Sequence, residues 1–179
     1  MGLVEKYIPR YTYSEWLHWE GRWELIEGIP IAMSPSPAPQ HRRVATEIRG
    51  ELSLALRQNR CTGCTAYDPV DFKISNVTIL RPDVLIVCGK IHKNYLDFPP
   101  VLVAEVLSKS TEDRDRNVKY DFYEQEGVKY YLIVDIKKKI IEIYQLVDGK
   151  YQLQEYKNKF EFKLSDNCTI TPELDNIWK

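Results

Sequence analysis

The sequence predicts an α/β (α+β) fold in which a central mixed β-sheet is flanked by helices. Residues 40–58 carry apolar side chains at helical spacing, which predicts a long amphipathic helix. Residues 101–107 form a nearly continuous apolar run, as expected for a central strand that is buried on both faces. Residues 108–127 favour a second helix and a strand follows, so this order predicts a right-handed crossover between parallel strands.

We expect residues 1–179 to form a single domain. The length, with 44% hydrophobic and 28% charged residues, is ordinary for one globular unit. No internal repeat and no linker divides the sequence. The core is expected over about residues 12–146, with further strands within residues 151–179.

The segment before the long helix contains smaller elements. Residues 11–20 begin with a cap-like Thr12 or Ser14, which predicts a short helix. Residues 23–33 hold two apolar stretches around a Glu-Gly turn, which is typical of a hairpin. Residues 34–39 alternate proline with serine or alanine, and this pattern excludes regular structure.

Strands dominate the second half of the chain. Residues 69–74 and 83–88 are interpreted as two strands that pair antiparallel with each other. Residues 130–135 and 140–146 predict another hairpin around a run of three lysines.

The helix over residues 108–127 has signals at both ends. Serine and threonine residues provide an N-cap at its start, and Gly127 suits its C-terminal end. We expect Val118 and Phe122 to form its apolar side.

Composition restricts the functional classes. The chain has 25 basic and 26 acidic residues, so it lacks a global positive field, and any nucleic-acid binding has to use a local patch. No run of about eighteen apolar residues predicts a membrane span, and the N-terminus lacks the pattern of a secretory signal. A cytoplasmic protein with no membrane partner is therefore expected.

The four cysteines are interpreted as small buried or turn thiols. A disulfide framework is not expected in a domain of this size without a secretory signal. Cys61 and Cys64 form one CxxC, but Cys88 and Cys168 stand alone, so a zinc site lacks a second close pair of ligands.

Glu105 is the one charged residue in the apolar run of residues 101–107. A carboxylate in a buried strand is costly unless it is paired, hydrogen-bonded or bound to a cation. Asp83 begins the preceding predicted strand and lies beside Glu105 if the two strands are neighbours. Two carboxylates on adjacent strands suit Mg²⁺ or Mn²⁺. The alternative is a structural pair that backbone amides or Arg81 satisfy.

Lys119 lies two turns into the following helix and shares a face with Asp115 and Tyr123. From this position its ammonium group can orient a water molecule or stabilise a phosphoryl transition state. An ordinary salt bridge to Asp115 explains the same spacing equally well.

A set of ordered motifs surrounds these residues. The sequence has Arg-Pro-Asp at residues 81–83, Val-Ala-Glu-Val-Leu-Ser-Lys-Ser-Thr at residues 103–111 and Gly-Val-Lys-Tyr-Tyr-Leu-Ile-Val-Asp at residues 127–135, with Lys119 and Tyr123 between the last two. Together they resemble the Uma family (DUF820-like) of restriction-endonuclease-like proteins. With Trp-Glu-Leu-Ile-Glu-Gly and Met-Ser-Pro nearer the N-terminus, the resemblance covers most of residues 12 to 145.

The resemblance implies a restriction-endonuclease-like core of the PD-(D/E)XK nuclease superfamily. In such a core, Asp83 and Glu105 hold Mg²⁺ (or Mn²⁺) and a lysine assists the attack of water on a DNA phosphodiester. Leu107 stands where the superfamily usually has this lysine. In the Uma-like group the lysine is found on the following helix, which Lys119 matches, and Lys109 is a rival.

Glu24 and His41 match positions that the family tends to keep near the site. A solvated hairpin acid and a solvent-facing histidine at a helix start explain them as well. Arg42, Arg43 and Arg49 are candidates for DNA contacts, although an ordinary charged helix face has the same pattern.

The sequence therefore predicts a metal-dependent DNA endonuclease. The competing function is a catalytically degenerate module of the same fold that binds nucleic acid or a protein partner, which the leucine at position 107 and the near-neutral charge permit. A homodimer suits the first function, since restriction-like enzymes often cut both strands as dimers, but no sequence feature locates an interface.

Overall fold

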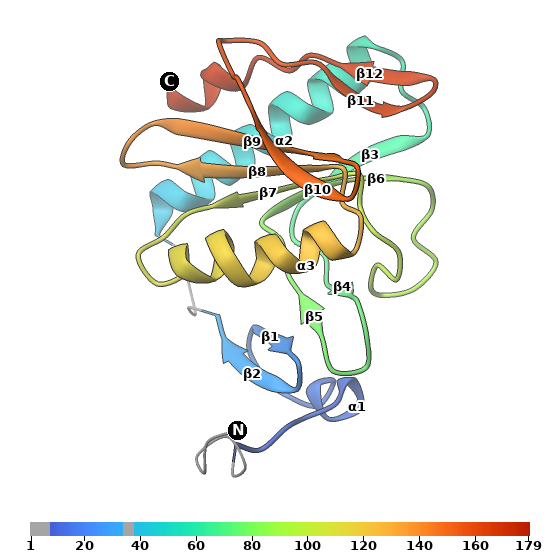
Figure 1. Cartoon of the computed structure of the whole chain (residues 1–179), viewed down its shortest axis with the longest axis vertical. Coiled ribbons are helices and arrows are strands. Elements are labelled where there is room, and N and C mark those ends of the chain that lie inside the picture. Colours follow the sequence, from blue (N-terminus) through green and yellow to red (C-terminus); the bar gives the residue numbers. More distant parts are fainter. Residues whose placement is uncertain (1–7, 34–37) are drawn as a thin grey trace.

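The computed structural model describes residues 8–33 and 38–179, so the predicted irregular segment of residues 34–39 lies largely outside the described residues. The main body is a mixed six-stranded sheet with the strand order β10-β9-β8-β7-β6-β3. One long helix covers one face of this sheet, and a shorter helical segment covers the other (Figure 1). The predicted central mixed sheet flanked by helices is confirmed.

The strands of the main sheet are β3 (Cys64–Tyr67), β6 (Val84–Cys88), β7 (Leu102–Val106), β8 (Tyr130–Asp135), β9 (Ile140–Val147) and β10 (Lys150–Gln154). Strands β7 and β8 are parallel, and the other neighbouring pairs are antiparallel. A helical connection links the two parallel strands, as the strand, helix, strand order of the sequence predicts.

A second, four-stranded sheet has the order β2-β1-β5-β4. It consists of β1 (Trp23–Ile26), β2 (Ile29–Ala32), β4 (Phe72–Lys73) and β5 (Ile79–Leu80). Glu27 and Gly28 form the turn between β1 and β2, both with positive φ, which is typical of a tight hairpin turn. The short helix α1 (Tyr13–Trp16) precedes this predicted hairpin, with Thr12 as its cap. The last elements are β11 (Phe162–Ser165), β12 (Cys168–Ile170) and the 3₁₀ turn η3 (Leu174–Trp178).

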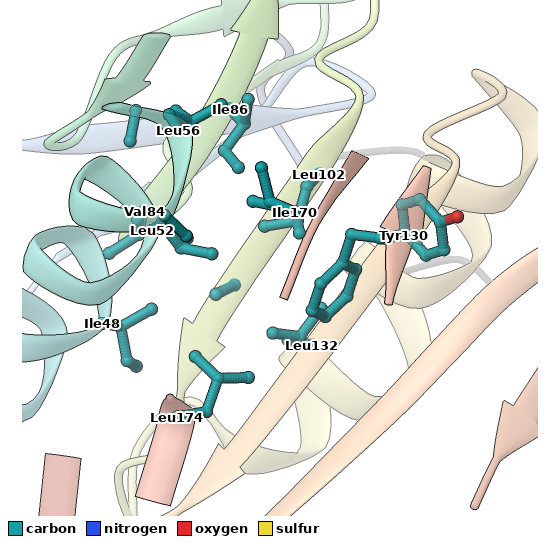
Figure 2. Packing of buried hydrophobic residues seen from close by; sticks show 14 of the residues in the cluster. Ile48, Leu52, Leu56, Val84, Ile86, Leu102, Tyr130, Leu132, Ile170 and Leu174 are labelled. Atoms are coloured by element: carbon teal, nitrogen blue, oxygen red, sulfur yellow. The ribbon is translucent and has the colours of Figure 1, made fainter. Parts of the chain in front are cut away.

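Helix α2 (Pro39–Gln58) agrees with the predicted amphipathic helix. Its buried side chains pack on one face of the main sheet together with residues of the C-terminal segment. Figure 2 shows Ile48, Leu52 and Leu56 directed toward side chains of β6, β7 and β8. The alternate residues of the same strands form a second core on the opposite face, with Tyr123 and Tyr131. The central strands are therefore buried on both sides, which explains their continuous apolar character.

The predicted pairing of residues 69–74 with residues 83–88 is wrong. Strand β4, which lies in the first of these segments, pairs with β5, whereas both edges of β6 are occupied by β3 and β7. Strand β3 was missed because its short Cys-Thr-Ala-Tyr sequence has no marked apolar alternation. Its place in the sheet comes from contacts with distant parts of the chain.

The helix after β7 has an unexpected register. Residues 114–119 form the π-helical segment η2 (Arg114–Lys119), and α3 (Tyr120–Gln125) continues it to a C-terminal Gly127 with positive φ. The prediction that Val118 and Phe122 form the apolar side is wrong for Val118, which is exposed. Phe122 is half-buried and packs against the core, in which Tyr123 is fully buried.

All four cysteines are in disulfides, so the interpretation as reduced thiols is wrong. Cys61 is bonded to Cys168, and Cys64 to Cys88. Cys64 and Cys88 are direct partners in the register of β3 and β6, while Cys61 and Cys168 are 107 residues apart in the sequence. Neither neighbourhood is visible in the spacing of cysteines along the chain.

Within residues 8–33 and 38–179, no helix combines the length and the apolar character that crossing a membrane requires.

Candidate active site

The register of β6 and β7 brings Asp83 and Glu105 together. Val84 pairs with Ala104, so Asp83 lies at the level of Glu105 on the neighbouring strand. The backbone N–H of Asp83 points to Oε2 of Glu105 at 3.4 Å, and the N–H of Val106 donates to Oδ2 of Asp83 at 2.9 Å. The two carboxylates are therefore neighbours on adjacent strands.

Lys119 is the centre of a buried ionic network. Its Nζ lies 2.8 Å from Oε1 of Glu105, 2.8 Å from Oε1 of Glu24 and 3.7 Å from Oδ1 of Asp115. Only 2% of its side chain is exposed. Burial favours the neutral amine, but the carboxylates of Glu105, Glu24 and Asp115 prevail and raise the pKa of Lys119. The ammonium form is therefore firmly held.

Glu24 comes from the hairpin sheet and is fully buried. Besides Lys119, it accepts a hydrogen bond from the backbone N–H of Arg81 at 2.9 Å, and its Oε2 lies 3.4 Å from Nε of Arg114. The pairing of β1 with β5 through Leu25 and Ile79 fixes this position. The alternative of a solvated hairpin acid is wrong for Glu24.

Burial makes the carboxyl groups of Glu105 and Asp115 hard to ionise. Desolvation raises the pKa of Glu105 well above its ordinary value, and the charges of Asp115, Asp83 and Glu24 add to this, although Lys119 opposes it. Desolvation also raises the pKa of Asp115, again against the effect of Lys119. The hydroxyl of Tyr123 donates a hydrogen bond to Oε1 of Glu105 at 2.9 Å, which fixes that carboxylate.

His41 lies in the first turns of α2 and contacts Asp83. Its Nε2 is 3.2 Å from Oδ2 of Asp83, and 12% of its side chain is exposed. Burial lowers the pKa of His41, but the hydrogen bond to Asp83 and the charge of that carboxylate together raise it by more, so the net shift of the pKa is upward. The alternative of a solvent-facing histidine is wrong.

The side chains of His41, Asp83, Glu105, Asp115 and Lys119 line a cavity of about 570 Å³, whereas Glu24 and Tyr123 are not part of its wall. Its walls come from the residue before β1, the end of β2, the start of α2, the ends of β6 and β7 and the start of η2. The charged and hydroxyl residues that line it include Arg22, His41, Arg42, Asp68, Arg81, Asp83, Glu105, Ser108, Ser110, Thr111, Arg114, Asp115 and Lys119. Strands, helices and loops far apart in the sequence therefore converge on one hollow.

The other residues predicted to act at the site lie outside this ionic network or form ion pairs with other residues. Arg42 lines the cavity, whereas Arg43 and Lys109 are exposed outside its wall. Arg49 pairs with Asp68 at 3.2 Å. The guanidinium of Arg81 pairs with Asp71 rather than with Asp83 or Glu105, so the proposed structural role of its side chain in that carboxylate pair is not found.

Two residues of the network were not predicted as site residues. Asp115 was seen only as a possible salt-bridge partner of Lys119, and its burial, with 2% exposed, is not evident from a helix sequence rich in charges. Arg114 carries no signal in the sequence, because its place depends on the π-helical register and on packing against the hairpin.

The donor set matches a hard divalent cation in part. The carboxylates of Asp83, Glu105 and Asp115 line the cavity together with Lys119 and Arg114, and Glu24 contacts both of these cations from outside the lining. Carboxylate oxygens such as those of Asp83 and Glu105 suit Mg²⁺ or Mn²⁺. In the described part of the chain, however, no three His, Cys, Asp or Glu side chains are already arranged around a common metal position. Water or substrate would have to complete the coordination of Asp83 and Glu105.

Comparison with known proteins agrees with this fold. The model of the Uma2 family, described as "Putative restriction endonuclease", matches residues 10–175. The chain therefore belongs to the Uma2 family, and the predicted family is confirmed.

A solved structure supports the same fold. The crystal structure of a putative nuclease belonging to DUF820 from Anabaena variabilis ATCC 29413 superposes with a TM-score of 0.71. The similarity covers 93% of this chain and 97% of that one at 14% sequence identity, so it shows the fold alone. No curated protein matches the chain.

Proposed function

We propose that this member of a nuclease family is a divalent-metal-dependent endonuclease that hydrolyses DNA phosphodiester bonds. The observation that carries the proposal is the pair of neighbouring carboxylates, Asp83 and Glu105, on adjacent strands at the cavity wall. Paired carboxylates of this kind suit a divalent cation, and membership of the Uma2 family, described as "Putative restriction endonuclease", supports DNA as the substrate.

Asp83 and Glu105 would hold the metal ion, which when bound would supply a Lewis acid and an activated water. Tyr123 and Lys119 fix Oε1 of Glu105 by hydrogen bonds of 2.9 and 2.8 Å. The backbone N–H of Val106 fixes Oδ2 of Asp83. Each carboxylate is thus oriented by donors that do not depend on substrate.

Lys119 would act as a cation and not as a general base. Its raised pKa keeps the ammonium form at neutral pH, so it cannot accept a proton from water. An ammonium group at the cavity wall stabilises negative charge that develops on a phosphoryl oxygen. His41, in contact with Asp83, orients that carboxylate.

The competing function is a degenerate module of the same fold that binds nucleic acid or a protein. One observation favours it, since the ammonium of Lys119 already contacts three carboxylates and is almost inaccessible. Such a module would not need a metal ion. The metal requirement therefore separates the two functions.

Calorimetry with Mn²⁺ tests the proposal, with plasmid cleavage followed in the same samples. Wild type is compared with Asp83→Asn and with the control Asp97→Asn, whose carboxylate pairs with Lys93 at the surface. We expect wild type and the control to bind the metal and cut DNA, and Asp83→Asn to do neither. Wild type without metal uptake would support the degenerate module, and uptake without cleavage of any nucleic acid contradicts a nuclease.

The proposed homodimer would present one such site to each strand of a duplex. Light scattering of the protein with and without a DNA duplex tests it, and a monomer mass in both samples contradicts it.

A further inference from the structure

Arg114 is the first residue of η2 and lines the cavity beside the carboxylate pair. Its side chain is 15% exposed, and its Nε lies 3.4 Å from Oε2 of Glu24. This contact is an ion pair without a hydrogen bond, since neither atom has a hydrogen-bond partner within the described residues. Glu24 therefore holds the inner end of the guanidinium group and leaves its outer end open.

The terminal nitrogens of Arg114 differ from those of other arginines nearby. Within residues 8–33 and 38–179, Nη1 and Nη2 of Arg114 have no acceptor, and neither atom is a buried unsatisfied group. By contrast, Arg116 forms a two-pronged pair with Glu142 at 2.9 and 2.7 Å. The guanidinium of Arg81 is paired with Asp71. Arg114 thus keeps the planar fork of N–H donors that recognises phosphate.

The wall next to Arg114 is polar and neutral. The hydroxyl of Ser108 lies 3.2 Å from that of Ser110 and 3.1 Å from that of Thr111, and all three residues line the cavity. Hydroxyl groups make hydrogen bonds with phosphate and sugar oxygens without adding charge. The nearby carboxylates of Asp83, Glu105 and Asp115 repel an anion, and a divalent cation reduces this repulsion.

We propose that Arg114 and the adjacent hydroxyl loop, Ser108 to Thr111, form a subsite for a backbone phosphate of the nucleic-acid substrate. The inference rests on the proposed function and makes it more specific. Arg114 binds the phosphate through its two terminal nitrogens, while Glu24 orients the guanidinium from behind. The subsite therefore fixes where the phosphodiester backbone lies relative to Asp83 and Glu105.

The first test is binding of a labelled DNA duplex, measured by fluorescence anisotropy in Ca²⁺ with cleavage checked in the same samples. We expect Arg114→Gln to weaken binding about ten-fold and to lower the slope of log affinity against log salt by about one. The affinity of Arg114→Lys should lie between those of wild type and Arg114→Gln, because lysine keeps the charge but lacks the planar pair of terminal nitrogens. The control Arg57→Gln loses the same charge about 24 Å from His41 along α2 and should bind as wild type does.

A second measurement needs no variant, in case Arg114→Gln does not fold. Wild-type protein is treated with phenylglyoxal, an arginine reagent, and modification is located by mass spectrometry. Bound duplex should protect Arg114 and leave Arg57 reactive. Equal modification of Arg114 with and without a bound duplex, or unchanged affinity in folded Arg114→Gln, overturns the subsite while leaving the proposed function intact.

Inorganic phosphate separates the subsite from the nuclease function. Calorimetry in Ca²⁺ should give phosphate binding in wild type and none in Arg114→Gln. If wild type binds phosphate in this way but no DNA, the nuclease function fails and the anion subsite stands. If wild type binds neither phosphate nor DNA, both proposals fail.

Discussion

The Nζ atom of Lys119 lies 2.8 Å from Oε1 of Glu24, a residue that belongs to a different β-sheet from Glu105. Glu24 is on β1 of the four-stranded sheet, and Glu105 is on β7 of the six-stranded sheet. Because Lys119 is equally close to both carboxylates, one buried cation joins the two sheets at the candidate active site. The ionic network therefore holds the two sheets together as well as forming part of the candidate active site.

Replacing Lys119 by methionine should leave Glu24 and Glu105 buried without a cation. We expect Lys119→Met to lower the free energy of unfolding at pH 8 by about 3–5 kcal/mol, the usual cost of breaking a buried ion pair. Urea unfolding followed by circular dichroism measures it. The control Lys93→Met removes an exposed ammonium from Asp97 and should change stability little. Equal losses in the two variants contradict the structural role of Lys119.

The metal-free protein should lose stability as the pH rises above about 5. Burial raises the pKa values of Glu105 and Asp115, so the folded chain keeps protons that the unfolded chain has already released. This contribution is complete below the unfolded values and is lost as the pH rises through the folded ones. Urea unfolding in a chelator across pH 5 to 8 tests the direction.

Glu105→Gln should flatten this pH dependence, because glutamine does not titrate. The control is Glu142→Gln, since Arg116 lowers the pKa of Glu142 and its contribution changes only at acidic pH. A slope in Glu105→Gln as steep as that of wild type would show that Glu105 ionises normally in the folded protein.

The hydroxyl of Tyr123 should contribute to stability through Glu105. We expect Tyr123→Phe to lower the free energy of unfolding by about 1–2 kcal/mol, since it removes a buried hydrogen bond of 2.9 Å to a carboxylate. Tyr120→Phe is the matched control, because the Tyr120 hydroxyl has no hydrogen bond to any described residue and is partly exposed. Similar losses from both substitutions argue against a strong hydrogen bond at Tyr123.

The carboxylate pair could be predicted because it interrupts a simple pattern. Glu105 breaks an apolar run that only a central strand produces, and Asp83 precedes the nearest strand-like segment. Lys119 and Tyr123 follow at helical spacing, and the π-helical register keeps them on one face with Asp115. Local patterns of this kind can be recognised in the sequence because each depends on only one or two secondary-structure elements.

The partners of Glu24 could not be predicted, because they depend on packing between two sheets. The sequence places Glu27 in the Glu-Gly turn and Glu24 in a strand, but nothing in it names the partners that surround the fully buried Glu24. Arg114 escaped notice for the same reason. Contacts between two sheets leave no periodic pattern in the sequence, so only the folded structure reveals them.

The hairpin that carries Glu24 depends on Gly28. This residue has φ +82°, and a Cβ there would lie 2.9 Å from Cβ of Arg10 and 3.3 Å from the carbonyl oxygen of Tyr11. Gly149 has a similar φ of +78° but open space around it. Its substitution by alanine therefore measures only the cost of holding a residue with a Cβ at positive φ. We expect Gly149→Ala to cost about 1–2 kcal/mol and Gly28→Ala clearly more. Equal losses of unfolding free energy in Gly28→Ala and Gly149→Ala would mean that the segment around Arg10 moves away from the added Cβ at no cost.

The two disulfides should stabilise the fold to different extents. In the chain-entropy account the contribution grows with the closed loop, so the Cys61–Cys168 bond, with a separation of 107 residues, should contribute about 5 kcal/mol. The Cys64–Cys88 bond, with a separation of 24 residues, should contribute about 3.5 kcal/mol. Urea unfolding of the two double-alanine variants measures both values. The same protein, denatured without reductant, should release no thiol, whereas four thiols per chain would contradict both bonds.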